Sequence, residues 1–393
     1  MKTLIELYDE RPLENVLAVE ALKPERVIYI CADAAAADVR CRKVLERYYA
    51  HRGIDTRVSF VSAERFDAES ILHRLRDVVE NNPDCALDIT GGTDAALFAA
   101  GILSAEYNIP TFTYSRRKNC FFNIRNAAFL DGTRCEATFR VEDFFLMAGG
   151  AMRTGRVDNA VLDSYSADVE PFFKLYLKHR RQWNRIVTWM QRASQLPKEA
   201  PITLFVQSSY QVKGDRGSRI DAPEEALQDM ERIDLIRDLW IDRGRSVSFR
   251  FRDEQIRYWL RDVGSVLELY VYHSCRETGL FQDVRCSAIV DWEDGVREHA
   301  VSNELDAVAV MGVVPVFISC KTCAANTEAL NELAILRDRF GGEMARAAIV
   351  TAENGGISLR NRAAELGIDV IDLRDLSAGR IGKRLKNIMS RTD

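Results

Sequence analysis

The first 115 residues alternate between short apolar runs and longer amphipathic segments. Strand-like runs lie at residues 3–7, 24–33, 55–62, 85–90 and 109–115, and helical patterns lie at residues 39–53, 68–82 and 94–108, with Pro12 starting an earlier helix. This alternation predicts a parallel sheet with helices on both faces. In such sheets, ligands bind beyond the carboxyl ends of the strands, where the strand order reverses.

A glycine pair follows the fourth predicted strand of this sheet. The sequence there is Thr90-Gly91-Gly92-Thr93, and the next helix begins at Asp94. Two glycines let the backbone approach a ligand, and the N-terminus of the following helix favours an anion such as phosphate. An ordinary tight turn between strand and helix explains the glycines equally well. The G-x-x-x-x-G-K-S/T spacing of a Walker loop is absent.

Three charged residues interrupt apolar runs between residues 263 and 323. Glu268 lies inside an apolar helical pattern, Asp306 starts the strand-like run DAVAVMG, and Lys321 ends the run PVFISCK. The turn at residues 312–315 predicts a hairpin, and Ser319 and Lys321 share a face because they are two residues apart. Two carboxylates that hold Mg²⁺ or Mn²⁺ beside a lysine are suited to phosphodiester cleavage. Charges that flank a hairpin are, however, often only solvated.

Length and charge limit the possible classes. The chain has 393 residues, which predicts two or three domains, and its net charge of −5 means that any nucleic-acid surface is local. The nine cysteines are scattered, which suggests a reducing cytoplasm, and Cys320-x-x-Cys323 lacks the second pair that a zinc site needs. We expect no membrane span and no signal sequence.

Both ends of the chain carry motifs of one known family. LDITGGTDAALFAAG at residues 87–101 resembles the D-x-T-G-G-T-K signature of CARF domains, and NELDAVAV with FISCKTC resembles a PD-(D/E)xK nuclease. In this order, they resemble the CRISPR-accessory CARF-domain nucleases of type III systems. The resemblance implies an α/β protein with a Rossmann-like CARF domain at 1–145, a helical or winged-helix-like connector at 146–262 and a restriction-endonuclease-like domain at 263–393.

The resemblance also implies a function. Cyclic tetra-adenylate would bind across a homodimer of CARF domains and activate a metal-dependent endonuclease that cuts single-stranded DNA and RNA. The expected ligand-binding residues are those of the glycine loop and of the loop after the first strand: Asp9, Arg11, Thr90, Gly91, Gly92, Thr93 and Asp94. The expected catalytic residues are Glu268, Glu304, Asp306, Ser319 and Lys321. Glu268, Asp306 and the backbone carbonyl of Cys320 would bind Mn²⁺ or Mg²⁺.

Two positions depart from the family pattern. Asp94 stands where the CARF signature has lysine, which reverses a charge next to the expected phosphates. Ser319 stands where a Glu-x-Lys nuclease has glutamate, and a hydroxyl cannot replace a carboxylate on the metal. We therefore expect Glu268, or else Glu304, to supply the missing carboxylate.

Other functions stay open at this point. A ligand-gated nucleic-acid-binding regulator with a degenerate nuclease domain is one alternative, and an enzyme that binds a mononucleotide at the glycine loop is another. In the middle of the chain, the basic stretch 178–185 and the pair Arg250 and Arg252 either contact nucleic acid or are solvated. Residues 207–222 are expected to form an exposed loop and residues 223–240 a helix.

Overall fold

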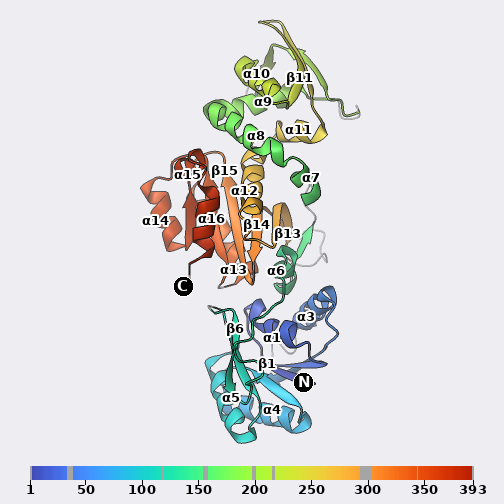
Figure 1. Cartoon of the computed structure of the whole chain (residues 1–393), viewed down its shortest axis with the longest axis vertical. Helices are drawn as coiled ribbons and strands as arrows, with labels where there is room; N and C mark the ends of the chain where they lie inside the picture. Colours follow the sequence, from blue (N-terminus) through green and yellow to red (C-terminus); the bar gives the residue numbers. More distant parts are fainter. Residues whose placement is uncertain are drawn as a thin grey trace.

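The structure is a computed structural model. It describes residues 2–32, 39–116, 118–153, 158–196, 201–214, 217–292, 302–342 and 344–391. Figure 1 shows three bodies along one long axis, with the N-terminal body at one end and the middle of the chain at the other. The C-terminal body lies between them, so the middle segment does not separate the two in space. The domain limits drawn from the sequence stay a prediction.

The N-terminal body is a six-stranded sheet with the order β3-β2-β1-β4-β5-β6. All neighbouring strands are parallel except β5 and β6, and the strand order reverses between β1 and β4. The strands are β1 (Thr3–Leu7), β2 (Arg26–Ala32), β3 (Arg57–Ala63), β4 (Cys85–Asp88), β5 (Thr111–Ser115) and β6 (Cys120–Arg125). The helical elements are η1 (Pro12–Asn15), α1 (Leu17–Leu22), α3 (Val39–Arg52), α4 (Ala68–Asn81) and α5 (Asp94–Tyr107).

The middle body combines helices with a three-stranded sheet in the order β11-β12-β8. Its helical elements are α7 (Asn159–Ser164), α8 (Ser166–His179), η2 (Arg180–Gln182), α9 (Trp183–Ala193), α10 (Glu224–Arg232) and α11 (Glu254–Trp259). Its strands are β8 (Phe205–Ser209), β9 (Gln211–Lys213), β10 (Arg219–Asp221), β11 (Ile236–Asp242) and β12 (Ser246–Phe251). Two expectations are corrected here, because 207–222 contains strands and the predicted helix 223–240 ends at Arg232. Ile236 is fully buried on the strand that follows.

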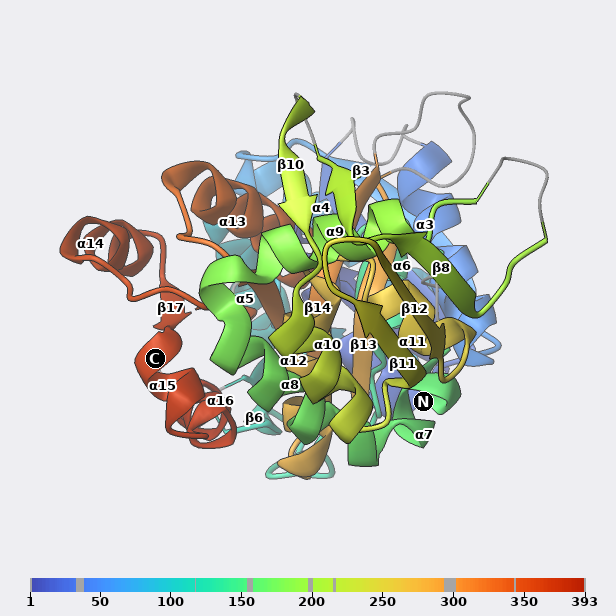
Figure 2. The ribbon, with the colours of Figure 1, turned by 90° about the horizontal axis from the view of Figure 1, so that it is seen from above.

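The C-terminal body is a mixed sheet with the order β17-β16-β15-β14-β13-β7. The strands are β7 (Ala151–Arg153), β13 (Asp283–Asp291), β14 (Ser302–Met311), β15 (Val314–Lys321), β16 (Arg346–Thr351) and β17 (Ile368–Ile371). The helices are α6 (Val141–Met147), α12 (Ser265–Glu277), α13 (Thr327–Gly341), α14 (Ile357–Glu365), α15 (Leu373–Ser377) and α16 (Ile381–Met389). The view along the long axis in Figure 2 places α14, α15 and α16 on one flank. The turn expected at 293–295 lies outside the described residues.

Each face of the C-terminal sheet packs against one neighbouring body. Ile318 and Ala307 belong to a buried cluster that includes α12 and the middle body. Phe317 and Val308 belong to a second cluster, which includes α6, α13 and one face of the N-terminal sheet. The sheet is therefore the shared support of the molecule, with apolar contacts on both sides. Among the described residues, no helix combines the length and the apolar character that a membrane span requires.

Candidate active site

Strands β14 and β15 part at Asp306. Their antiparallel pairing runs from Met311 opposite Val314 to Ala307 opposite Ile318. It ends there, so Asp306, the next residue of β14 in this direction, is not paired with β15. In the gap, Oδ2 of Asp306 accepts hydrogen bonds from the backbone amide of Cys320 at 2.6 Å and from Oγ of Ser319 at 3.2 Å. The carboxylate thus takes the place of a strand carbonyl and is held by the main chain of β15.

Lys321 lies at the end of β15, beside this carboxylate. Its Nζ is 4.0 Å from Oδ2 of Asp306, and β15 continues there in parallel pairing with β16. Burial raises the pKa of Asp306, although the amide of Cys320 and the charge of Lys321 act in the opposite direction. The Lys321 side chain is about one-third exposed, so its ammonium group can reach a phosphate as well as the carboxylate.

Glu268 faces the pair from helix α12. Oε2 of Glu268 accepts a hydrogen bond of 3.0 Å from Oγ of Ser287 on β13. Burial raises the pKa of Glu268 to about 8, and the negative charge of Asp306 acts in the same direction. The two carboxyl groups therefore influence each other's charge in a poorly solvated place, where ionisation of both is unfavourable without a cation.

Ser287 owes its position to an irregularity in β13. Its φ is +50°, which is rare for a residue other than glycine. Cys286 packs on the α12 face of the sheet, whereas Ala288, two residues on, packs on the opposite face. Residues two apart in a regular strand share a face, so the side-chain alternation breaks at Ser287. The break turns its hydroxyl toward Glu268, and no sequence pattern indicated it.

Asp262 is a second residue that we did not anticipate. Its Oδ2 accepts hydrogen bonds from the amides of Gly264 and Ser265 and from Oγ of Ser265, which caps the start of α12. Its charge further raises the pKa of Glu268, after burial and Asp306. The spacing of an aspartate three residues before Ser265 is a signal for a helix start that could have identified it.

The structure thus brings Glu268, Asp306, Ser319 and Lys321 together. Glu304 lies two residues before Asp306 and is exposed, and it reaches the site only through its charge. Cys320 contacts Asp306 through its amide; because the N–H and C=O of one strand residue point to the same neighbour, its carbonyl also faces β14. The assignment of catalytic and metal-binding roles to these residues stays a prediction.

The chemistry of these groups fits a divalent cation. Glu268 and Asp306 offer carboxylate oxygens, and burial raises the pKa of both. The negative charges of Asp262 and Glu304 raise the pKa of Glu268 further. Hard cations such as Mg²⁺ and Mn²⁺ prefer carboxylate and carbonyl oxygens. A cation between the two carboxylates would offset the repulsion that now favours their protonated forms.

A cavity of about 290 Å³ lies at the carboxyl ends of the N-terminal strands. Tyr8 lines it just after β1, Ala32 and Ala63 line it at the ends of β2 and β3, and Thr93 lines it from the N-terminus of α5. Arg65 also reaches the cavity and forms an ion pair with Glu10 at 2.7 Å. The cavity is therefore where the strand alternation predicted a ligand site, with Tyr8 and Arg65 as lining residues that we did not anticipate.

Asp9 holds the glycine loop. It accepts hydrogen bonds from the amide of Gly92 at 3.0 Å and from the backbone and guanidinium of Arg11. A Cβ on Gly91 would lie 2.9 Å from Cβ of Asp9, and one on Gly92 would lie 2.7 Å from Cβ of Leu7. The glycines thus permit close approach of the loop to β1, and the amide of Gly92 is bonded to Asp9.

The remaining predicted ligand residues have different contacts. Thr90 bonds Asp88 through its amide and hydroxyl, and its Oγ1 accepts from the amide of Tyr114, so it joins β4 to β5. Thr93 caps α5 by accepting from the amide of Ala96. Asp94 is exposed in the first turn of α5. Thr93 lines the cavity, whereas neither Thr90 nor Asp94 does.

A third group of acidic and histidine side chains lies in the middle body. His179, Glu225 and Asp229 approach one another closely enough to hold an ion. Lys178 already donates to Asp229 at 2.6 Å and to Glu225 at 2.8 Å. The ammonium group thus supplies the positive charge there, so the cluster is better explained as an ion-pair network than as a metal site.

Residues 253–391 match the family model of the Card1-like endonuclease domain. This part of the chain carries Glu268, Asp306 and Lys321, and it is an endonuclease domain. The nuclease predicted from the sequence is confirmed at this level. No protein with curated annotation matches the sequence of this chain.

Solved structures share the fold over nearly the whole chain. Protein VC1899 from Vibrio cholerae has a TM-score of 0.75 at 18% identity and covers 98% of this chain and 97% of its own. Can2 from Sulfobacillus thermosulfidooxidans, in complex with cyclic tetra-adenylate, has a TM-score of 0.69 at 18% identity, and the match covers 99% of this chain and 98% of Can2. A type III CRISPR defence DNA nuclease activated by cyclic oligoadenylate has a TM-score of 0.51 at 16% identity, and the match covers 99% of this chain and 51% of that nuclease. The α/β fold predicted from the resemblance to CARF nucleases is confirmed.

Proposed function

We propose that this protein is a metal-dependent endonuclease that a cyclic oligoadenylate activates through the N-terminal body, in type III CRISPR defence. The observation that carries the proposal is the placement of Asp306 in the gap between β14 and β15. There it has Lys321 at 4.0 Å and faces Glu268, inside a domain that matches an endonuclease family. Single-stranded DNA or RNA is the proposed substrate. We place its action in the cytoplasm, which suits nine cysteines that are scattered along the chain.

The residues divide the chemical work between them. Glu268 and Asp306, with the carbonyl of Cys320, would hold Mn²⁺ or Mg²⁺, which when bound polarises the scissile phosphate. Lys321 orients the attacking water and stabilises the charge that develops on the phosphate oxygens. Ser319 donates to Asp306 and is in our proposal a positioning residue. Ser287 orients Glu268 in the same way.

The activator is proposed for the cavity at the end of the N-terminal sheet. The overall fold follows that of Can2, which was solved with cyclic tetra-adenylate. The cavity joins the aromatic ring of Tyr8, the guanidinium of Arg65 and the N-terminus of α5, which suit adenine and phosphate. Asp94 is exposed outside the cavity lining, so its negative charge is compatible with such a ligand. A homodimer that shares the ring between two N-terminal bodies is part of the proposal.

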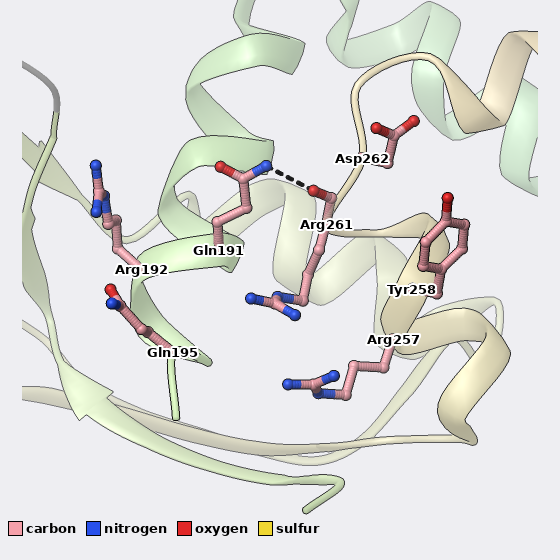
Figure 3. A pocket seen from close by; sticks show the side chains of 7 residues that line it. All are labelled: Gln191, Arg192, Gln195, Arg257, Tyr258, Arg261 and Asp262. Atoms are coloured by element: carbon pink, nitrogen blue, oxygen red, sulfur yellow. Dashed lines mark hydrogen bonds between the residues drawn. The ribbon is translucent and has the colours of Figure 1, made fainter. Parts of the chain in front are cut away.

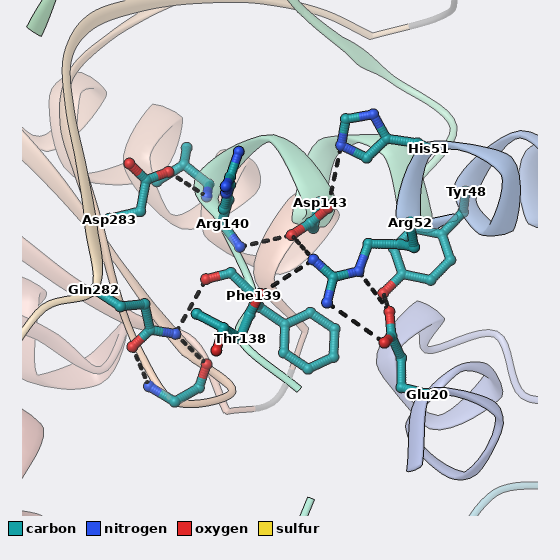
Figure 4. A network of polar contacts seen from close by, with 12 residues as sticks. Glu20, Tyr48, His51, Arg52, Thr138, Phe139, Arg140, Asp143, Gln282 and Asp283 are labelled. Carbon is teal, nitrogen blue, oxygen red and sulfur yellow. Dashed lines mark hydrogen bonds and ion pairs between the residues drawn. The ribbon is translucent and has the colours of Figure 1, made fainter. Parts of the chain in front are cut away.

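A polar network supports transmission from this body to the nuclease (Figure 4). Arg52 on α3 donates to Glu20 at 2.6 Å, to the carbonyl of Thr138 at 3.1 Å and to Asp143 on α6 at 3.2 Å. The segment before α6 therefore follows movements of α3. Helix α6 in turn contacts β13 and β14.

The same segment is also bonded to the nuclease sheet. The amide of Val141 donates to Asp283 at 2.9 Å, at the start of β13. Gln282 donates to the carbonyls of Phe139 and Gly312, and Gly312 lies in the turn between β14 and β15. A shift of the segment thus acts on the strands that position Ser287, Asp306 and Lys321.

The test is a cleavage assay on the full chain with single-stranded DNA, single-stranded RNA and duplex DNA. Each substrate is incubated with Mn²⁺ or EDTA, with and without cyclic tetra-adenylate, and Lys321→Ala serves as the inactive control. We expect Mn²⁺-dependent cutting of single strands that cyclic tetra-adenylate stimulates. Binding of nucleic acid without cleavage under any condition would favour the ligand-gated regulator, which the serine at position 319 makes the second candidate.

A further inference from the structure

A basic cavity of about 500 Å³ lies between α9, α11 and the loop that follows α11 (Figure 3). Helix α9 contributes Gln191 and Arg192, helix α11 contributes Arg257, and the following loop contributes Arg261. Gln191 donates to the carbonyl of Arg261 at 2.6 Å, which fixes the loop against α9. Three guanidinium groups thus line one space, and Asp262 is the acidic residue of its lining.

Two of these guanidinium groups, those of Arg257 and Arg261, have no acidic partner among the described residues. Asp262 uses Oδ2 to cap α12. Within the described ranges, no carboxylate lies at ion-pair distance from Arg257 or Arg261, and Nε of each is buried without a hydrogen-bond partner. Burial and the charge of Arg257 lower the pKa of Arg261. An anion in the cavity would offset the burial of these guanidinium groups and the repulsion between them.

The cavity adjoins the candidate catalytic glutamate. Tyr258 lines both this cavity and the small pocket that contains Glu268 and Ser287. A Cβ on Gly264 would lie 2.6 Å from Oε1 of Glu268 and 3.6 Å from Oδ2 of Asp262. Gly264 therefore lies beside both Glu268 and Asp262, and Asp262 lines the arginine cavity.

The arginines that the sequence had suggested for nucleic-acid contact are placed differently. Arg252 is bonded through two nitrogens to Asp168 at 2.7 and 2.8 Å and to Asp253, so it is a structural ion pair. Arg250 stacks over Phe205 and lies 3.8 Å from Asp238. Neither residue lines the cavity.

We propose that the cavity lined by Arg192, Arg257 and Arg261 binds phosphates of the single-stranded substrate and positions the strand across Glu268. The inference rests on the proposed nuclease function. Guanidinium groups bind phosphate oxygens with two parallel hydrogen bonds, and such contacts fix the register of a strand without reading its bases. The cavity therefore contributes equally to the binding of DNA and RNA.

The test compares the double variant Arg257→Ala/Arg261→Ala with the wild-type full chain. Binding of a short fluorescent single-stranded DNA or RNA is measured in EDTA with cyclic tetra-adenylate present, over a range of salt concentrations. We expect roughly tenfold weaker binding of both strands, and a slope of log K against log salt that is smaller by about 1.4. The matched control is Arg245→Ala/Arg250→Ala, which removes the same charge from exposed positions of the same body.

Two further measurements separate the possible failures. Hydrolysis of bis(p-nitrophenyl) phosphate with Mn²⁺ needs no contact with a strand, so the double variant should lose less of this activity than of its affinity for strands. Wild-type protein that cleaves strands while the double variant binds them as tightly as the control would overturn the inference but not the nuclease. The second measurement asks whether the strand displaces inorganic phosphate from wild-type protein. If it does, but the double variant binds strands as tightly as wild-type protein, the inference is also overturned. A wild-type protein that hydrolyses neither substrate would instead remove the nuclease function.

Discussion

The carboxylate of Asp306 accepts a hydrogen bond of 2.6 Å from the backbone amide of Cys320, across the gap where β14 and β15 part. The acid is therefore fixed by the main chain, and the longer bond from Ser319 is a secondary restraint. The serine at position 319, where the pattern that this chain resembles has glutamate, therefore adds little to the restraint on Asp306.

Ser319→Ala should reduce cleavage by less than tenfold. The variant loses one hydrogen bond of about 1 kcal/mol, while the amide of Cys320 still holds Asp306. Initial rates with Mn²⁺ and single-stranded DNA measure the effect, and Asp306→Asn is the comparison that should abolish cleavage. Equal losses in the two variants would show that the serine is itself a catalytic group.

Lys321→Ala should lower the cleavage rate at least a hundredfold. The ammonium group is the positive charge beside Asp306, and loss of one such group from a phosphoryl-transfer site costs about a hundredfold or more. Circular dichroism and cyclic tetra-adenylate binding should be unchanged. Lys383→Ala on α16 removes an exposed lysine of the same domain and serves as the control. Retention of full activity in Lys321→Ala would exclude this residue from the mechanism.

Glu268 should make Mn²⁺ binding depend on pH. Because its pKa is raised to about 8, it is mostly protonated at pH 7 and must release its proton when an ion binds. Titration calorimetry at pH 7 in buffers of different ionisation enthalpy should show close to one proton released per ion in wild-type protein. Glu268→Gln should bind Mn²⁺ more weakly and release almost none, whereas equal release in both proteins would contradict the assignment.

The same group affects the stability of the metal-free protein. Below its ordinary pKa of 4.5, Glu268 is protonated in the folded and the unfolded chain and has no effect. Between pH 4.5 and about pH 8, Glu268 has lost its proton in the unfolded chain but still holds it in the folded chain. The folded state therefore becomes less stable as the pH rises, by at most about 1.4 kcal/mol per pH unit. Urea unfolding should show a smaller loss over this range in Glu268→Gln.

The sequence predicted the acids and the lysine but not what orients them. Asp306 and Lys321 were visible because each interrupts or ends an apolar strand, and the hairpin between them follows from a short turn. Ser287 was not visible, because its role depends on a left-handed backbone conformation within a strand. Such a conformation is set by the packing of both sheet faces, which no local pattern records.

The middle of the chain shows a second limit of the sequence. Residues 223–240 are charged at helical spacing, yet Ile236 and its neighbours form a strand because β12 pairs with them. Likewise, Arg252 looked available for nucleic acid, although Asp168, 84 residues earlier in the chain, pairs with it. Contacts between residues this distant in sequence decide which charges are free.

Gly264→Ala should impair cleavage without unfolding the protein. Its φ and ψ of −82° and −34° suit alanine, but the new methyl group would lie 2.6 Å from Oε1 of Glu268 and displace that carboxylate. We expect at least a tenfold lower cleavage rate and weaker Mn²⁺ binding. The control is Gly101→Ala, where an added Cβ meets no atom within 4 Å. Unchanged cleavage in Gly264→Ala would mean that Glu268 is not part of the site.

Arg52→Gln should weaken activation by cyclic tetra-adenylate more than it weakens basal cleavage. Arg52 joins α3 to Asp143 on α6, and α6 contacts the strands of the nuclease site. Allosteric coupling energies are typically about 1–3 kcal/mol, so we expect the ratio of activated to basal rate to fall about fivefold or more. Rates with and without the activator are measured together with the melting temperature. Arg74→Gln, an exposed arginine on α4, is the control.

A double-variant cycle with Asp143→Asn tests whether Arg52 acts through that carboxylate. Arg52 also contacts Glu20 and Thr138, so loss of the arginine alone does not identify its partner. If the ion pair transmits activation, the double variant should have the same ratio of activated to basal rate as each single variant, since removal of either partner already breaks it. Strictly additive losses would instead indicate two independent routes. A fall in basal and activated rates by the same factor would show that Arg52 stabilises the fold without coupling the two bodies.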